Sequence, residues 1–185
     1  MKKVIKVVMP LAVTILIASC GNNGNNENKQ EKDSTEHEGH DMSDKSSSTG
    51  KLSVKDDKLN AVYQHYVHLT TALVNDDAKE AKVASNAIEA GIKEIPGGES
   101  IAVNAAKITA AGDIEVQRAA YAPLSNDFIA LVKKSGINGG ELYADFCPMA
   151  LNDKGAYWLN ASKEIRNPYM GQKMLTCGEV KETIK

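Results

Sequence analysis

The chain has 185 residues, of which 25% are charged, and its formal net charge is −2. This length is enough for one folded domain with a real core. No face rich in lysine or arginine is evident, so the composition argues against a nucleic-acid-binding protein, and we expect no nucleic acid among the partners.

The chain begins MKKVIKVVMPLAVTILIASC, with three lysines before an apolar run and small residues after it. This is the layout of a secretory signal peptide, and the run is too short for a standard membrane-spanning helix. Residues 17–20, IASC, resemble the bacterial lipoprotein box. We therefore expect residues 1–19 to be removed, Cys20 to carry the lipid, and the protein to be an outer-membrane lipoprotein facing the periplasm. The alternative is a plain secretory signal with a chance cysteine.

Residues 20–54 form a polar tail after the leader. In residues 21–50 the single large apolar side chain is Met42, so we expect this segment to be disordered and to act as a flexible tether. It contains HEGHDM, in which His37, His40 and Met42 supply imidazole and thioether ligands suited to copper. The segment is thus either a metal-capturing tail or a plain solvated linker.

Residues 55–185 are expected to form one domain that is mostly helical. Apolar residues at helical spacing predict four helices: 56–74, 76–95, 99–111 and 113–135. Pro123 lies inside the last of these and is expected to kink or split it. Short connections between the helices favour an all-α fold, a four-helix up-and-down bundle.

The helical periodicity ends near Gly136, and residues 141–185 are predicted to form a loop-rich cap on the bundle. Short strands are expected near ELYADF and CGEVKETI. Because the cap is rich in Gly, Pro and Asn, it must pack on the bundle and would gain stability from a covalent cross-link.

The cap holds the two cysteines that remain once Cys20 is assigned to the lipid, and each has a methionine nearby. Cys147 lies in FCPMA with Met149, and Cys177 lies in MLTCG with Met174. One interpretation is a disulfide, which an oxidising compartment favours and which would stabilise the domain by about 3.5 kcal/mol on a chain-entropy model. The other is a site for monovalent copper or silver, the ions that thiolate and thioether ligands select.

His65 and His68 lie three positions apart on the first predicted helix and could complete such a site, although histidines in this setting are usually surface polar residues. Nothing in the sequence supports a catalytic Cys/His dyad. No Cys-x-x-Cys pair, phosphate-binding glycine loop or His-Glu-x-x-His motif occurs. We therefore predict no catalytic residues and no enzymatic activity.

Four motifs give the cap a family resemblance. They are CPMA at 147–150, GAYWL at 155–159, EIRNPY at 164–169 and MLTCG at 174–178. Together with ALVNDDAKEA and DIEVQRAAYAPLS in the helical part, they resemble a bacterial domain of unknown function. That domain is also found fused to the C-terminus of the periplasmic adaptor (membrane-fusion) subunits of copper/silver efflux pumps.

The resemblance implies a role linked to copper. It favours binding or transfer of monovalent copper or silver by Cys147, Met149, Met174 and Cys177, with an efflux adaptor or a metallochaperone as partner. Many members have histidine before the motif cysteine, whereas this chain has Phe146. The alternative is a disulfide-stapled helical module that docks on an envelope protein without metal. The same thiols could also bind copper when reduced and form the disulfide when oxidised.

Overall fold

The computed structural model describes residues 52–185. The predicted signal peptide, Cys20 and the tail residues His37, His40 and Met42 lie outside the described residues. The helical elements are α1 (Asp57–Val74), α2 (Ala78–Ile92), α3 (Glu99–Ala110), α4 (Ile114–Ser135), α5 (Ala150–Asp153) and the 3-10 turn η1 (Gly171–Lys173). The strands are β1 (Ser53–Val54), β2 (Ile137–Asn138), β3 (Leu142–Cys147), β4 (Ala156–Asn160) and β5 (Glu179–Ile184). Among these described elements, no helix is both long and apolar enough to span a membrane.

The four long helices confirm the helices expected from the sequence, and three of them begin at acidic N-caps. Asp56 accepts a hydrogen bond from the amide of Leu59 at 2.8 Å, and Asp77 and Asp113 cap α2 and α4 in the same way. A kink or a split was expected at Pro123, and the structure shows no split, since α4 continues through this residue. The proline costs one helical hydrogen bond, which the buried side chains on either side of it offset.

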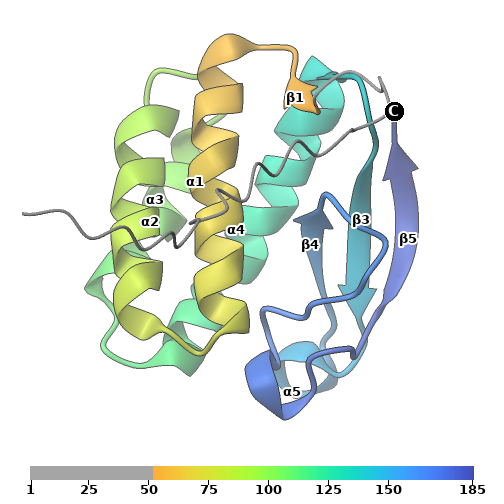
Figure 1. Cartoon of the computed structure of the whole chain (residues 1–185). Helices are drawn as coiled ribbons and strands as arrows, with labels where there is room; N and C mark the ends of the chain where they lie inside the picture. The colour runs from red at the N-terminus through yellow and green to blue at the C-terminus, as the bar shows by residue number, and fades with distance from the viewer. Residues whose placement is uncertain (1–51) are drawn as a thin grey trace, which may run out of the picture. The chain divides into compact units, whose positions relative to one another are not determined.

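Consecutive long helices pack side by side and run in alternating directions (Figure 1). This is the part of the predicted bundle that the structure shows. Between α1 and α4 the contact is largely aromatic, since the rings of Tyr66 and Phe128 stack at 4.5 Å and those of Tyr66 and Tyr121 lie 5.8 Å apart. The apolar stripes of all four helices meet in a single core.

The predicted all-α class is wrong, because the C-terminal part forms a sheet. The described residues are 55% helical and 16% strand, so the fold is mixed α/β. In the larger sheet β3 lies between β4 and β5, and both pairings are antiparallel; β1 and β2 form a separate two-stranded ribbon. β3 and β5 lie near the two expected strand segments, whereas β4 was not expected. Five of the six β3 residues are buried, so the strand lacks the alternation of polar and apolar residues that reveals a half-exposed strand.

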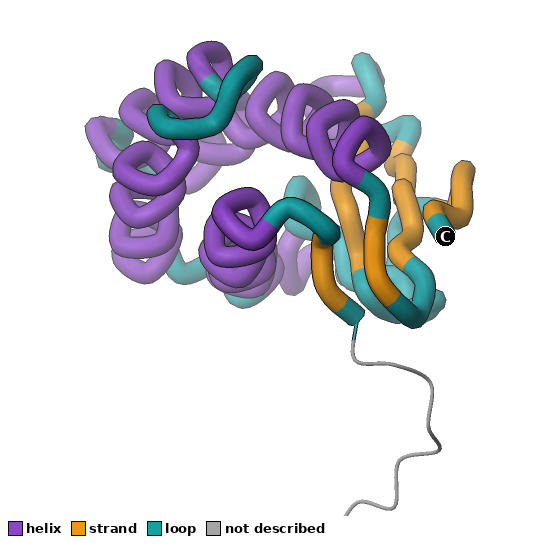
Figure 2. Tube along the Cα trace, turned by 90° about the horizontal axis from the view of Figure 1, so that it is seen from above, coloured by secondary structure: helices purple, strands orange, loops and turns teal. Residues whose placement is uncertain are grey.

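The three-stranded sheet lies beside α4, with β4 against that helix (Figure 1 and Figure 2). The amide of Leu159 on β4 donates to the hydroxyl of Tyr66 at 2.9 Å. That hydroxyl also bonds to Ser125 at 2.7 Å and accepts from Tyr121 at 2.8 Å. This buried cluster fixes the sheet against α1 and α4, and it thereby fixes the end of β3 where Cys147 lies.

Candidate functional site

The two cysteines of the folded domain lie side by side. Cys147 is the last residue of β3, pairs with Ala156 of β4, and is fully buried. Cys177 lies in the loop between η1 and β5 and is half-buried. Their sulfur atoms are 2.7 Å apart, and no covalent bond joins them. Two thiols this close can be oxidised to a disulfide. Two thiolates that share one metal ion lie farther apart, so the pair would separate slightly to hold an ion between them.

The Cys177 thiol holds its proton tightly. The hydrogen bond with Cys147, followed by burial and the charge of Cys147, raises the pKa of Cys177 to about 11. The protonated thiol therefore dominates at neutral pH. A metal ion that binds here must displace protons from sulfur, since the thiolate is the ligand.

Replacing Cys147 with alanine should raise the rate at which iodoacetamide alkylates Cys177 about tenfold at pH 8. The substitution removes the hydrogen bond that contributes most to the raised pKa, so the thiolate fraction increases. The lower nucleophilicity of a less basic thiolate offsets part of that gain. Mass spectrometry of the peptide that contains Cys177 gives the rate, and the urea-unfolded chain gives the reference. Equal alkylation rates of Cys177 in the native protein and in Cys147→Ala would contradict a hydrogen bond between the two thiols.

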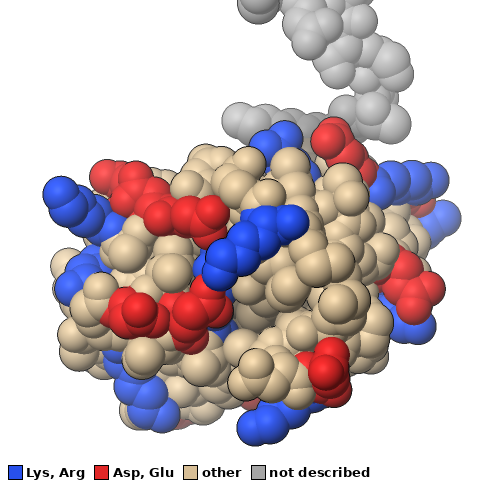
Figure 3. Space-filling model, turned by 90° about the horizontal axis from the view of Figure 1, so that it is seen from below, with Lys and Arg blue, Asp and Glu red and all other residues tan. Residues whose placement is uncertain are grey.

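The three methionines of the described residues all lie between the cysteines in sequence. The carbonyl of Met174 accepts the amide hydrogen bond of Cys177 at 3.1 Å, so these two residues share one tight turn. Met149 follows Cys147 by two positions and lines, with Met170, a groove of about 770 Å³. The side chains of Met149 and Met174 are 46% and 40% exposed, so both thioethers are accessible. Seen from below, acidic and basic side chains lie interspersed with uncharged surface (Figure 3).

His65 and His68 face α2 and lie away from the thiol pair. The imidazole Nε2 of His68 is 2.9 Å from the carboxylate of Glu80 on α2, and His65 lines a groove with Gly91 of the same helix. The sheet lies on the other side of α1 (Figure 1). Within residues 52–185, no group of three or more His, Cys, Asp or Glu side chains is arranged to hold a metal ion. The structure thus brings neither of these histidines to the thiols.

Phe146, the residue before Cys147, points to the face of the sheet opposite Cys147. Successive side chains of a strand alternate between faces. The ring of Phe146 packs against that of Tyr157 with centroids 4.5 Å apart, and the Lys181 ammonium lies 5.8 Å from its centre. Phe146 therefore has a packing role away from the two sulfurs.

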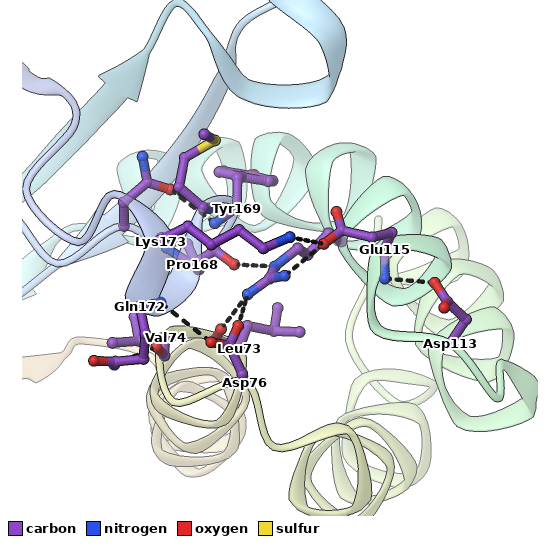
Figure 4. Close-up of polar contacts among 12 residues, drawn as sticks. Leu73, Val74, Asp76, Asp113, Glu115, Pro168, Tyr169, Gln172 and Lys173 are labelled. Atoms are coloured by element: carbon purple, nitrogen blue, oxygen red, sulfur yellow. Dashed lines mark hydrogen bonds and ion pairs between the residues drawn. The ribbon is translucent and has the colours of Figure 1, made fainter.

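A buried arginine, which the sequence analysis did not single out, joins the C-terminal segment to the helices. Arg118 of α4 is 1% exposed and donates to the carbonyl oxygens of Leu73 and Pro168, each at 2.8 Å. It also pairs with the carboxylate of Asp76, in the loop between α1 and α2, and with that of Glu115, three positions earlier on α4 (Figure 4). The sequence did carry a signal, because Arg118 is a charged residue on the buried stripe of α4.

The same cluster anchors η1. Asp76 accepts a hydrogen bond from the amide of Gln172 at 3.2 Å, and Gly171 has a φ of 55° and no room for a side chain beside Asp76 and Arg118. Burial raises the pKa of Asp76, but the hydrogen bond from Arg118 and its charge outweigh this, so the pKa lies below its ordinary value. The start of the loop that carries Met174 and Cys177 is therefore held against the helices.

Asp145 is a buried acid on β3, two positions before Cys147. Its Oδ2 accepts a hydrogen bond from Asn160 at 3.1 Å, while its Oδ1 has no partner among the described residues. The indole N–H of its cross-strand neighbour Trp158 also has no partner in that part of the chain. Burial raises the pKa of Asp145 to about 6, and the hydrogen bond from Asn160 offsets only part of the rise. The carboxyl group therefore changes charge close to neutral pH.

Comparison with known proteins bears on the helical part of the chain. No curated protein and no solved structure gave a match. The match that was found is to the family model described as "Protein of unknown function (DUF3347)", over residues 62–140. It runs from α1 to the loop before β3, and so ends before both cysteines. The helical part of the chain is thus similar to a domain family of unknown function, as the sequence resemblance implied.

Proposed function

We propose that the domain binds one monovalent copper or silver ion through the thiolates of Cys147 and Cys177. The observation that carries the proposal is the 2.7 Å separation of the two sulfur atoms, which come from a strand end and an anchored loop. Thiolate ligands select soft monovalent ions over hard ones. The donor set therefore fits copper(I) or silver(I) better than a hard cation.

The exposed thioethers of Met149 and Met174 suit transfer of the ion. Both belong to the segments that carry the cysteines, and both remain accessible to solvent. A neutral thioether binds a soft ion without releasing a proton, so it can hold the ion briefly before the thiols are deprotonated. In this proposal the methionines receive the ion and pass it to the thiol pair.

The rest of the chain supports the same role by composition and resemblance. His37, His40 and Met42 of the tail would collect the ion, and a lipid on Cys20 would keep the protein at the membrane facing the periplasm. The partner would be a copper/silver efflux adaptor or a metallochaperone, since the sequence resembles a domain fused to such adaptors. No enzymatic activity is part of the proposal.

A second candidate has the same structural support. Two thiols this close can also be oxidised to a disulfide, which would staple the sheet to the loop after η1. The protein would then be a helical module that docks on an envelope protein without metal. The two candidates differ in what the reduced protein does when copper(I) is supplied.

The test is an anaerobic titration of copper(I) into the reduced chain beginning at residue 21, in competition with a chromogenic chelator. We expect one tight equivalent for the native sequence and at least a tenfold weaker affinity for Cys147→Ser. Leucine at both Met149 and Met174 should weaken binding less, by up to about tenfold, since thioethers are the weaker ligands. The Met170→Leu variant is the matched control and should bind as the native protein does.

A variant with alanine at His37, His40 and Met42 separates the tail from the domain. Retention of the tight equivalent in this variant places the site in the folded domain. If the equivalent is lost there but kept in Cys147→Ser, the tail is the binding site. No competition by any of the proteins would refute copper binding and leave the stapled module.

A further inference from the structure

We infer that Asn167 is the residue that positions Cys177 against Cys147. The inference rests on the thiol pair being the site of the proposed function. It adds how the pair is assembled, and it therefore holds for metal binding and for disulfide formation alike.

The two cysteines are held by different means. Cys147 is fixed by β3, whose neighbours β4 and β5 pair with it on both sides. Cys177 lies outside the sheet, and its amide donates only to Met174 within the same loop. Its carbonyl oxygen accepts a hydrogen bond of 2.6 Å from the side-chain Nδ2 of Asn167. That bond ties the backbone of Cys177 to a residue ten positions earlier.

Asn167 is fully buried, and its other polar atoms close the same loop. Its amide donates to the carbonyl of Leu175 at 2.8 Å, and its own carbonyl accepts from Gly171 at 3.0 Å. Its side-chain Oδ1 accepts from the amides of Tyr169 at 2.8 Å and Met170 at 3.1 Å. One residue therefore joins both ends of the segment that carries Cys177.

The site requires an acceptor and a donor at the tip of one short side chain. Asparagine provides both, because its amide has a carbonyl oxygen and an NH₂ group. Aspartate has the same shape but no donor, so its carboxylate would face the carbonyl of Cys177. Serine can still accept from the amide two residues later, as in an ST turn, but it is too short to reach Cys177. Both variants remove the hydrogen bond to the backbone carbonyl of Cys177 while keeping part of the turn.

The test is the redox equilibrium of the thiol pair with glutathione. In this reaction the two thiols give two protons and two electrons to glutathione disulfide, so that a Cys147–Cys177 bond forms and two glutathione thiols are released. The equilibrium constant measures how well the fold presents one sulfur to the other. We expect Asn167→Asp and Asn167→Ser each to lower it at least tenfold.

Gln172→Glu is the matched control, since it makes the same amide-to-carboxylate change in the same segment. Gln172 donates to Val74 at 2.8 Å and does not contact Cys177, so its variant should stay within about twofold of the native value. Urea unfolding of each protein shows whether stability alone accounts for a change. An unchanged constant in both Asn167 variants, an equal shift in Gln172→Glu, or unfolding of both Asn167 variants would overturn the inference.

Copper(I) titration of the same proteins separates the two proposals. A redox shift in the Asn167 variants with no copper binding by the native protein would refute the proposed function and leave the positioning role intact. Copper binding that is equally tight in native and variant proteins, together with an unchanged redox constant, would refute the positioning role alone.

Discussion

Replacing Arg118 with methionine is expected to lower the free energy of unfolding by about 3–5 kcal/mol. Methionine keeps an unbranched apolar stem but has none of the donors of arginine. The carbonyl oxygen of Pro168 would lose its side-chain donor, and the carbonyl oxygen of Leu73 and the carboxylate of Asp76 would each lose one of their donors. A buried acceptor without a partner costs more than the lost bond, because water cannot replace it. Chemical denaturation followed by circular dichroism gives the value.

The exposed Arg166 is the matched control, because it is the other arginine of the chain. Arg166→Met should change the free energy of unfolding by less than about 0.5 kcal/mol. Arg118→Lys should fall between the two, since lysine keeps the charge but lacks the planar fork that serves several acceptors at once. A loss below about 1 kcal/mol for Arg118→Met would show that this cluster does not hold the C-terminal segment in place.

The helices could be predicted because helix formation depends mainly on residues close together in the sequence. Apolar residues recur at the helical period, and the acidic caps Asp56 and Asp113 mark where two of the helices begin. The sheet could not be predicted to the same degree. β3 is buried on both faces by segments distant in sequence, and β4 is only five residues long. Strands were expected near β3 and β5, but β4 was missed and the pairing of the three strands into one sheet was not foreseen, so the domain was assigned to the all-α class.

The candidate site, too, could be predicted from the sequence only in part. The pairing of Cys147 with Cys177 was open to prediction, because two cysteines with neighbouring methionines suggest one shared site whichever chemistry they serve. The contribution of Asn167 could not be predicted, since it depends on hydrogen bonds between the two ends of a loop that come together only in the folded protein. For His65 and His68 the helical spacing was informative about their common side of α1 but not about which element lies there. The structure shows that element to be α2.

The native protein is expected to lose stability as the pH rises from about 4 to about 7, because Asp145 ionises in this range. The Asp145→Asn variant is expected not to show this loss. The pKa of Asp145 is about 6 in the folded protein, whereas an aspartate in an unfolded chain has a pKa of about 3.9. Between these values the folded protein binds a proton that the unfolded chain has released, so the free energy of unfolding falls as the pH rises. The loss is at most about 3 kcal/mol and is complete above about pH 7. Asparagine does not ionise, so the variant should keep this stability.

The measurement is urea denaturation at several pH values for the native protein, Asp145→Asn and the control Asp127→Asn. Asp127 accepts a hydrogen bond from Ser100 and is not fully buried, so its variant should follow the pH dependence of the native protein. At pH 7 Asp145→Asn should be the most stable of the three. Parallel curves for the native protein and Asp145→Asn would contradict the raised pKa. Because Asp145 lies on the same strand as Cys147, the expected result would also mean that ionisation of Asp145 makes the fold that holds the thiol pair less stable at neutral pH than in mildly acidic solution.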